Sequence, residues 1–216
     1  MGRPAKVQAI STPDRLLDAA EQEFAALGFA LARLADIAER AGIRRPSLLY
    51  HFPSKDLLYR AVVERVFDQL SAVLLRSLAR EGDIAERIDA VVQAFLEFLA
   101  ERPSLAPIIV REVIAEPDPA RPEGSHGRTI LLERVVPLLG MLEDILRREG
   151  GDRLRDDLPV RAALAEVAGG LLLRSAAGTL RAPLWGAGDH SLALARHLFL
   201  RDSNSPDPNP RDPKET

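Results

Sequence analysis

The stretch LADIAERAGIRRPSLLYHFPSKDLL, residues 34–58, contains two short helical patterns on either side of one glycine. Apolar residues recur at helical spacing over 34–41, and Gly42 then supplies the left-handed backbone that a tight turn requires. A second short helix is predicted over about 45–51, and Pro53 ends it. Two short helices joined by such a turn form a helix-turn-helix.

The second of these helices is predicted to be a recognition helix, which would lie in the major groove of DNA. Arginine can donate two bonds to a guanine edge, serine can bond to bases or phosphates, and tyrosine and histidine can reach the DNA backbone. Lys55 follows at a helix start, which Ser54 should cap and where free amide groups suit a phosphate. The alternative is a small solvated helix pair that binds no nucleic acid. The candidate DNA-contacting residues are Arg3, Arg33, Arg44, Arg45, Pro46, Ser47, Leu49, Tyr50, His51 and Lys55.

Composition limits the fold class and the compartment. The 216 residues are 46% hydrophobic and 5% aromatic, which favours an aliphatic, helix-rich core. The absence of cysteine excludes disulfides and thiolate metal sites and is typical of the reducing cytoplasm. The sequence has neither an apolar run of transmembrane length nor a secretory signal, so we expect a soluble cytoplasmic protein. With a formal net charge of −3, a local cluster of bases would have to make any contact with phosphates.

The sequence shows no strand pattern and no internal repeat, so we predict an all-α protein in two parts. Residues 1–11 are expected to be a flexible basic arm, which could reach the minor groove or be an ordinary disordered terminus. Residues 12–56 should form a three-helix DNA-binding domain, and residues 57–200 a C-terminal helical bundle. The Pro-rich, polar residues 201–216 are expected to be disordered.

Apolar spacing and breaker residues predict the helix boundaries. Thr12 should cap the first helix, and Gly28 should stop it. Pro137 is expected to kink its helix, and Pro117 to Gly127 to form a loop. The remaining predicted helices are 54–80, 84–102, 104–115, 128–149, 160–181 and 189–200.

The order and spacing of residues 13–60 resemble those of the TetR (tetracycline-repressor) family of bacterial transcriptional regulators. The resemblance covers about the first quarter of the chain, and the rest is similar only in being helical and of suitable length. The segments that carry it are Gly2-Arg3-Pro4, Leu16-Leu17-Asp18-Ala19-Ala20, Phe24, Gly28-Phe29, Asp36-Ile37-Ala38, Ala41-Gly42-Ile43, Leu48 to Phe52 and Ser54-Lys55-Asp56-Leu57.

The chain departs from the family pattern at three places. Ala32 and Arg33 stand where the family usually has Thr or Ser at the start of its second helix, and Arg44 stands where it usually has Ser. These two helices are therefore predicted to begin without a side-chain cap, at about 1 kcal/mol for each missing cap. Leu49 replaces a Tyr and removes a phosphate contact.

The resemblance implies a small-molecule effector site among the central helices of the C-terminal bundle. An apolar cavity with a few inward polar groups would suit such a ligand. Arg111 and Arg174 are of interest because each interrupts an apolar run, although each could instead sit at a helix end or pair internally with Glu112 or Glu166. The candidate ligand-binding residues are Phe95, Phe98, Ile108, Arg111, Glu112, Leu138, Met141, Arg174 and Trp185.

The predicted helix 160–181 is apolar over most of its circumference and rich in small residues, so it needs cover on more than one side. We expect it to pair with helix 189–200 and with the same two helices of a second copy, as a four-helix bundle. The alternative is the central core helix of a monomer. The candidate interface residues are Leu164, Val167, Gly170, Leu171, Arg174, Leu194 and Leu198.

The leading hypothesis is a homodimeric DNA-binding repressor, which a small-molecule effector releases from a palindromic operator. One alternative is a helix-turn-helix regulator with no small-molecule effector. A second is a helical hydrolase that uses His126, although no oriented triad is recognisable. The four histidines lack the spacing of a helical metal site, so no metal is expected. No cofactor and no membrane partner are expected either.

Overall fold

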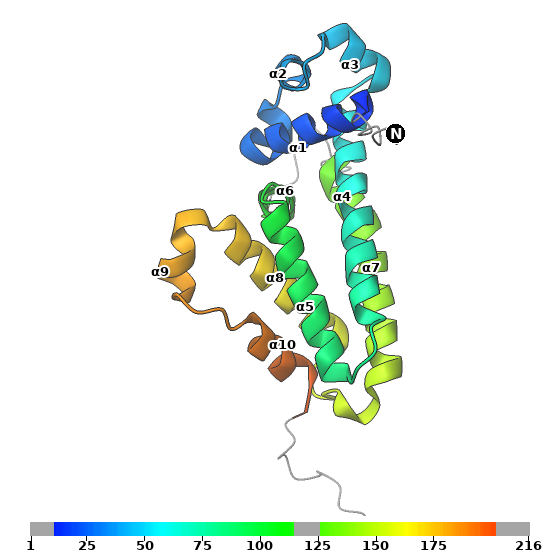
Figure 1. The fold of residues 1–216 in the computed structure, drawn as a ribbon, viewed down its shortest axis with the longest axis vertical. Helices are drawn as coiled ribbons and strands as arrows, with labels where there is room; N and C mark the ends of the chain where they lie inside the picture. The colour runs from blue at the N-terminus through cyan, green and yellow to red at the C-terminus, as the bar shows by residue number, and fades with distance from the viewer. Residues whose placement is uncertain (1–10, 115–125, 202–216) are drawn as a thin grey trace, which may run out of the picture.

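The computed structural model describes residues 11–114 and 126–201, which form an elongated all-α structure (Figure 1). A small N-terminal domain lies at one end, and a helical bundle makes up the rest. The all-α prediction is confirmed. The predicted arm, the tail and most of the predicted 117–127 loop lie outside the described residues. His126 and Gly127 already belong to a helix, so the loop prediction extended two residues too far.

The N-terminal domain contains three helices: α1 (Thr12–Leu31), α2 (Leu34–Arg40) and α3 (Arg45–His51). Its core is made by apolar residues that the helical spacing placed on one face of each helix, and they are buried: Leu16, Ala20, Phe24, Ile37, Ala38 and Leu48. The cap of α1 is Ser11, whose hydroxyl accepts a hydrogen bond from the Asp14 amide. The prediction that Thr12 caps this helix was therefore wrong by one residue.

Gly28 kinks α1 rather than ending it. Its backbone has φ 75° and ψ 170°, and residues 29–31 then resume the helix. The positive φ favours glycine. A Cβ atom at this position would also lie 2.5 Å from Nη1 of Arg111, so Arg111 packs directly against the kink.

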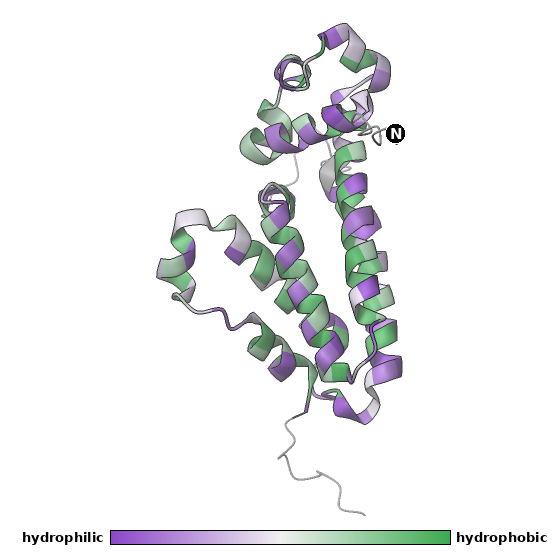
Figure 2. Ribbon diagram, viewed as in Figure 1, coloured by the Kyte–Doolittle hydropathy of each residue, from purple (hydrophilic) through white to green (hydrophobic). Residues whose placement is uncertain are grey.

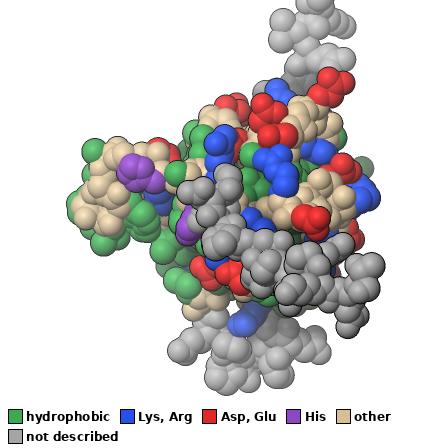
Figure 3. All heavy atoms as spheres, turned by 90° about the horizontal axis from the view of Figure 1, so that it is seen from below, with side chains coloured by type: hydrophobic (Ala, Val, Ile, Leu, Met, Phe, Trp, Pro, Cys, Tyr) green, Lys and Arg blue, Asp and Glu red, His purple; other side chains and the backbone are tan. Residues whose placement is uncertain are grey.

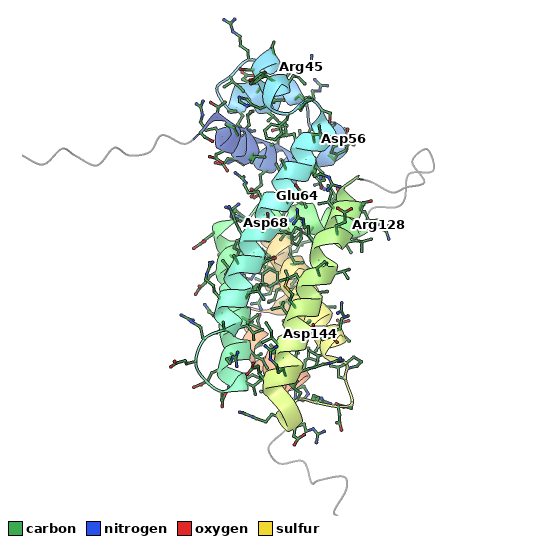
Figure 4. The ribbon with its side chains drawn as sticks, turned by 90° about the vertical axis from the view of Figure 1, so that its right-hand side faces the viewer. Arg45, Asp56, Glu64, Asp68, Arg128 and Asp144 are labelled. Carbon is green, nitrogen blue, oxygen red and sulfur yellow. The ribbon has the colours of Figure 1, made fainter. Side chains whose placement is uncertain are left out.

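Helix α4 (Lys55–Leu78) runs from the small domain along the bundle, and Ser54 caps it as predicted by accepting from the Leu57 amide at 3.1 Å. It lies beside α7 (His126–Gly150), which continues through Pro137 (Figures 1 and 4). Glu64 and Asp68 of α4 both pair with Arg134 of α7, at 3.1 and 3.2 Å.

The other bundle helices complete the layer around α4. Helix α5 (Ile84–Glu101) begins with a capping box between Asp83 and Glu86, and α6 (Leu105–Ile114) follows it. Helices α8 (Val160–Ala176) and α10 (Ser191–Phe199) pack against α5 and against each other. A short η1 turn (Gly151–Arg153) follows α7. Hydrophobic residues occupy the sides of these helices that face one another (Figure 2).

The predicted helix 160–181 ends earlier, at Ala176. A 3-10 turn, η2 (Gly178–Leu180), and a separate short helix, α9 (Arg181–Trp185), follow it. Gly178 has φ 53°, a backbone conformation that an α-helix cannot contain. Among the described elements α9 is packed mainly on η2 and the end of α8, so it projects from the bundle (Figure 1).

Arg174 fastens the base of this projecting segment. Its buried guanidinium donates to the Gly188 carbonyl at 2.8 Å and to Asp189 at 3.1 Å. Hydrogen bonds from Ser191, together with the positive charge of Arg174, hold the pKa of Asp189 below its usual value. When the molecule is seen from below, the lobe at the left, where α9 lies, shows many hydrophobic side chains (Figure 3). Leu180 of η2 and Leu184 of α9 are both exposed.

No helix in the described ranges combines the length and the apolar character needed to cross a membrane.

Candidate nucleic-acid interface and apolar cavity

The turn between α2 and α3 has the geometry that the sequence predicts. Gly42 has φ 71°, its amide donates to the Glu39 carbonyl, and the Ile43 amide donates to the Ala38 carbonyl, both at 2.9 Å. These bonds satisfy the last carbonyls of α2 and direct the chain into α3. Leu48 is fully buried and anchors α3 to the domain.

The two helices begin without side-chain caps, as the departures from the family pattern indicated. In the described part of the chain neither Arg33 nor Arg44 makes a cap hydrogen bond through its side chain. Packing through Leu48 therefore has to hold α3, a helix of 7 residues that would be unstable alone.

The exposed side of α3 carries most of the candidate DNA contacts. Arg44, Arg45, Pro46 and Ser47 are exposed, and the Tyr50 side chain is 85% exposed. Arg45 lies at the end of the molecule farthest from the bundle (Figure 4). The arrangement fits a helix whose N-terminal half enters a groove.

The remaining candidates are placed differently. Arg33 is exposed beside α2. Leu49 is partly buried against the core, and the half-buried His51 ring lies 5.4 Å from the Tyr50 ring. Arg3 lies outside the described residues. All these contacts remain predictions.

Arg45→Ala is expected to weaken specific DNA binding and to relax base preference at one position of the site. An exposed arginine at the start of α3 can donate two hydrogen bonds to the edge of a guanine, and losing such a contact costs roughly 1–3 kcal/mol. Binding to a set of single-base operator variants measures both effects. Arg148→Ala, an exposed arginine on α7, is the matched control. Unchanged affinity and unchanged base preference would mean that α3 does not lie in the groove.

Lys55 has a structural role that the sequence did not reveal. Its ammonium donates to the carbonyls of Ala30 and Ala32, at 3.2 and 3.0 Å, and lies 4.6 Å from the centre of the Phe29 ring. Lys55 therefore ties the end of α1 to the start of α4. An ammonium has three donors, so one remains for the predicted phosphate contact.

Lys55→Met is expected to lower DNA affinity about equally on all sequences, and to lower the slope of log affinity against log salt by about one unit. It should also reduce the free energy of unfolding by roughly 2–3 kcal/mol, because two charge-assisted hydrogen bonds to the carbonyls of Ala30 and Ala32 are lost. Titrations at several salt concentrations and urea unfolding measure the two effects separately. A sequence-selective loss of binding would contradict the phosphate role, and a stability loss with an unchanged salt slope would leave Lys55 a purely structural residue.

A buried carboxylate joins the small domain to the bundle. Glu21 of α1 accepts from Ser104 at 2.5 Å, from Arg65 at 3.1 Å and from Arg102 at 3.3 Å. Arg65 also pairs with Asp18 at 2.8 Å. The carboxylate thus holds α1 against α4 and against the corner between α5 and α6.

A second buried contact joins α4 to α6. The Tyr59 hydroxyl donates to Glu112 at 2.7 Å inside the protein. Burial raises the pKa of Tyr59 well above its usual range, and the negative charge of Glu112 raises it further. The phenol therefore stays protonated and remains a donor at every physiological pH.

These contacts correct the predicted roles of the charged ligand-binding candidates. Arg111 packs on the Gly28 kink, and Glu112 bonds to Tyr59. Arg174 pairs with Asp189, which was not among the partners considered from the sequence. A long charged side chain in an apolar run was in each case held by another element of the same chain.

A cavity of about 370 Å³ lies at the centre of the bundle. Every side chain that the described residues contribute to its lining is apolar. Of the nine predicted ligand residues, Phe95 and Leu138 line it. Phe98 instead faces Arg102, Met141 is 43% exposed, and Trp185 lies on α9. Ile108 lines a separate, much smaller space next to Tyr59.

Most of the cavity lining was missed because its residues lie on helices far apart in the sequence. The missed residues are Phe67, Leu70, Leu74 and Leu78 of α4; Ile88, Val91 and Val92 of α5; Ile109 and Val113 of α6; Leu131, Val135, Leu139, Leu142 and Leu146 of α7; Leu164, Ala165, Val167, Ala168, Gly169, Leu171 and Leu172 of α8; and Phe199 of α10. Apolar spacing marked many of them as core residues. Spacing alone does not tell a packed core from one that contains a cavity.

The cavity also decides which face of α8 is free. Leu164, Val167 and Leu171, three of the predicted interface residues, point inward to the cavity, and Arg174 is buried in its pairing with Asp189. Burial within the chain argues against Leu164, Leu171 and Arg174 as interface residues, whereas the half-buried Val167 stays a prediction. Outside the cavity lining, the exposed apolar residues of α8 are Gly170 and Leu173.

The other interface candidates fit an outer face. Gly170 of α8 and Leu194 of α10 are exposed, and Leu198 is half-buried. An interface built from these two helices stays a prediction, with Gly170 and Leu173 as its exposed α8 residues.

The side chain of His126 lies outside the described part of the structure, as does any contact it makes. Among the described residues no group of three or more His, Asp or Glu side chains is arranged to hold a metal ion.

Comparison with known proteins finds one matching family model, described as "Bacterial regulatory proteins, tetR family", over residues 16–62. The HTH-type transcriptional repressor Rv1474c of Mycobacterium tuberculosis is 31% identical over 169 residues, which is 76% of this chain and 82% of that protein. The HTH-type transcriptional activator FasR of Mycolicibacterium smegmatis is 39% identical over 85 residues, which is 39% of each chain. This chain matches between 39% and 55% of the length of FasR and of two further regulators, YdgC and RutR.

Among solved structures, the ketosteroid transcriptional regulator KstR2 of Mycobacterium tuberculosis has the same fold. Its TM-score is 0.66 at 22% sequence identity, and the alignment covers 90% of this chain and 98% of that one.

Proposed function

Because the chain belongs to the TetR family of bacterial regulatory proteins and is a DNA-binding transcriptional regulator of the helix-turn-helix type, we propose that it is a repressor released from its operator by a small molecule. The observation that carries the proposal is the position of α6. Ile109 and Val113 of this helix line the cavity, while Arg111 and Glu112 contact α1 and α4. One helix therefore touches both the candidate ligand site and the DNA-binding domain.

The release mechanism follows from the contacts of α6. A ligand that enlarges or fills the cavity acts directly on Ile109 and Val113. A shift of α6 then strains the buried Tyr59–Glu112 hydrogen bond and the contact between Arg111 and Gly28. Both contacts lead to α1 or to the first turns of α4, and these helices carry α3. The ligand can change DNA affinity only in so far as it binds one arrangement of α6 better than the other.

We further propose that the protein binds DNA as a homodimer through α8 and α10. A palindromic site needs two recognition helices about one helical turn apart, roughly 34–36 Å, which one copy cannot provide. On the face of α8 outside the cavity lining, Gly170 is small enough to allow close helix approach and Leu173 is exposed, and Leu194 of α10 adds apolar area. The projecting segment that follows α8 also exposes Leu180 of η2 and Leu184 of α9.

Repression is favoured over activation because Rv1474c, which matches 76% of this chain, is named a repressor, whereas FasR, which matches 39% of it, is named an activator. A reporter gene placed behind the DNA upstream of the protein's own gene tests the direction. Deleting the regulator should raise expression. A fall in expression would make the protein an activator.

The binding experiment is a salt titration on that upstream DNA with the full chain. Steep loss of affinity with salt is expected from phosphate contacts by Lys and Arg. A screen of apolar small molecules for DNA release then separates the proposal from its alternative. Specific, salt-dependent DNA binding would favour a regulator without a small-molecule effector if no compound released the DNA, even though calorimetry showed that compounds bind in the cavity.

A further inference from the structure

The described residues that line the cavity offer no partner for a charged group. They come from α4, α5, α6, α7, α8 and α10, and their side chains are aliphatic groups and phenyl rings, apart from one glycine. Ile88, Val92 and Leu142 of the lining are at most 4% exposed. An ion placed against such residues would lose its water and gain no hydrogen bond.

The lining is also apolar where it meets solvent. Val113 of α6 and Ala165 and Gly169 of α8 are lining residues that are exposed. None of the three has a side chain that can donate or accept a hydrogen bond. A charged group left in the water beside them would keep its hydration without gaining a partner from the described lining. Charge on a ligand therefore adds nothing to binding at the exposed residues and opposes binding at the buried ones.

Buried charged side chains on the lining helices are already paired with other parts of the chain. Among the described residues these pairs are Glu112 with Tyr59 at 2.7 Å, Glu143 with Arg161 at 2.7 Å, and Arg174 with Asp189 at 3.1 Å. None of these six residues belongs to the lining. Turning one of the buried charges into the cavity would break its pair and leave a buried group unsatisfied.

We propose that the cavity selects uncharged hydrophobic effectors, and that it takes up a weak acid or base only in the neutral form. This rests on the proposed function, and it names the chemical class of ligand for that cavity. Phenyl rings of the lining can attract a cation, namely Phe67, Phe95 and Phe199, but the attraction is weaker than the hydration that an enclosed cation loses. Carboxylates, phosphate esters and ammonium ions are the classes that the cavity rejects.

The test compares molecules of the same shape that differ in charge, by calorimetry on the full-length protein without DNA. One pair is 4-tert-butylnitrobenzene and 4-tert-butylbenzoate, and the other is tert-butylbenzene and the phenyltrimethylammonium ion. At about pH 7.5 each neutral compound should bind at least ~100-fold more tightly than its ion. Equal or tighter binding of either ion would overturn the proposal, and so would a failure of both neutral compounds to bind.

A pH series separates the two forms of the acid. Above the pKa of 4-tert-butylbenzoic acid its affinity should fall about tenfold for each pH unit, because the neutral form that binds becomes scarcer by that factor. The described lining contains no titratable side chain, so the nitro compound should bind equally throughout the series and serves as the control. An acid affinity that stays constant with pH would show that the anion itself binds, against the proposal.

A charge placed at the edge of the cavity should reverse the selection. Ala165→Arg puts a guanidinium at an exposed lining residue of α8, so affinity for 4-tert-butylbenzoate at about pH 7.5 should rise at least ~10-fold. Val113→Arg, at an exposed lining residue of α6, takes its place if that variant does not fold. Ser175→Arg is the matched control, because Ser175 is exposed on α8 outside the lining. No rise, or an equal rise in the control, would place the compounds outside the cavity and contradict the proposal.

DNA release is measured separately, by adding the same four compounds to the protein–operator complex. Selective binding of the neutral compounds without release supports the ligand class and contradicts ligand-released repression. Release by the ions, together with no binding of the neutral compounds, contradicts the ligand class and keeps the proposed function.

Discussion

Leu173→Glu is expected to turn the protein into a folded monomer that no longer binds a palindromic operator with useful affinity. Leu173 lies on the face of α8 outside the cavity lining and is 51% exposed, so a charge there costs the isolated chain little. In a two-fold interface the same patch meets itself, and two glutamates would be buried together. Loss of one half-site should reduce specific affinity at least ~100-fold, since specific binding exceeds non-specific binding by larger factors still.

Sedimentation at micromolar concentration and circular dichroism measure assembly and folding of this variant. Leu132→Glu is the control, a comparably exposed leucine on α7 and outside the α8–α10 surface. Leu171→Glu would not be a clean test, because Leu171 lines the cavity and its replacement would destabilise the bundle. The interface model fails if the Leu173→Glu variant sediments like the wild type. The dimer model as a whole fails if the wild type is a monomer that still binds its operator.

The second large effect is expected on stability. Glu21→Ala should lower the free energy of unfolding by about 3 kcal/mol, because removing one member of a buried ion cluster leaves the others without compensation. The Glu21 side chain is 8% exposed, and its partners Arg65 and Arg102 are 17% and 28% exposed. Asp18 still pairs with Arg65 after the change, whereas the pairing of Arg102 and the acceptor for Ser104 are lost.

Urea unfolding of both proteins gives the difference directly. Glu133→Ala removes an exposed partner of Arg60 and should cost less than about 1 kcal/mol, which makes it the matched control. Glu21→Gln keeps the shape and one acceptor, so an intermediate loss is expected. Equal losses for Glu21→Ala and Glu133→Ala would show that the cluster does not hold α1 to the bundle.

Local features of the fold were predictable because neighbouring residues determine them. The bounds of α3, the Ser54 cap and the Gly42 turn each follow from a few adjacent side chains. The error at the start of α1 has the same local origin. Ser11 and Thr12 are both acceptable caps, and Pro13 can occupy either of the first two helical positions.

Contacts between distant segments were not predictable. Glu21 reaches Arg65, Arg102 and Ser104, which are 44, 81 and 83 residues away. Many arginines in the chain could have filled these places, and nothing in the spacing selects one. Arg174 is a similar case, since its partner Asp189 became available only because the chain folds back after α9.

The rotation of α8 about its own axis was the main failure in the candidate sites. A helix that is apolar on nearly all sides gives no sequence signal for its inward face. Leu171 and Leu173 look equivalent in the sequence, yet one is 5% and the other 51% exposed. The surrounding helices decide the difference, and their arrangement depends on the whole bundle.

The length of α4 sets the scale on which this regulator could act. Its 24 residues make a rod roughly 36 Å long, which runs from the DNA-binding domain to the cavity-lining residue Leu78. A rod of that length converts a rotation of roughly 5° at one end into a displacement of ~3 Å at the other, close to the 3.4 Å rise of a single base pair. A small rotation of α4 at the cavity would thus displace each α3 along the DNA by about the spacing of one base pair.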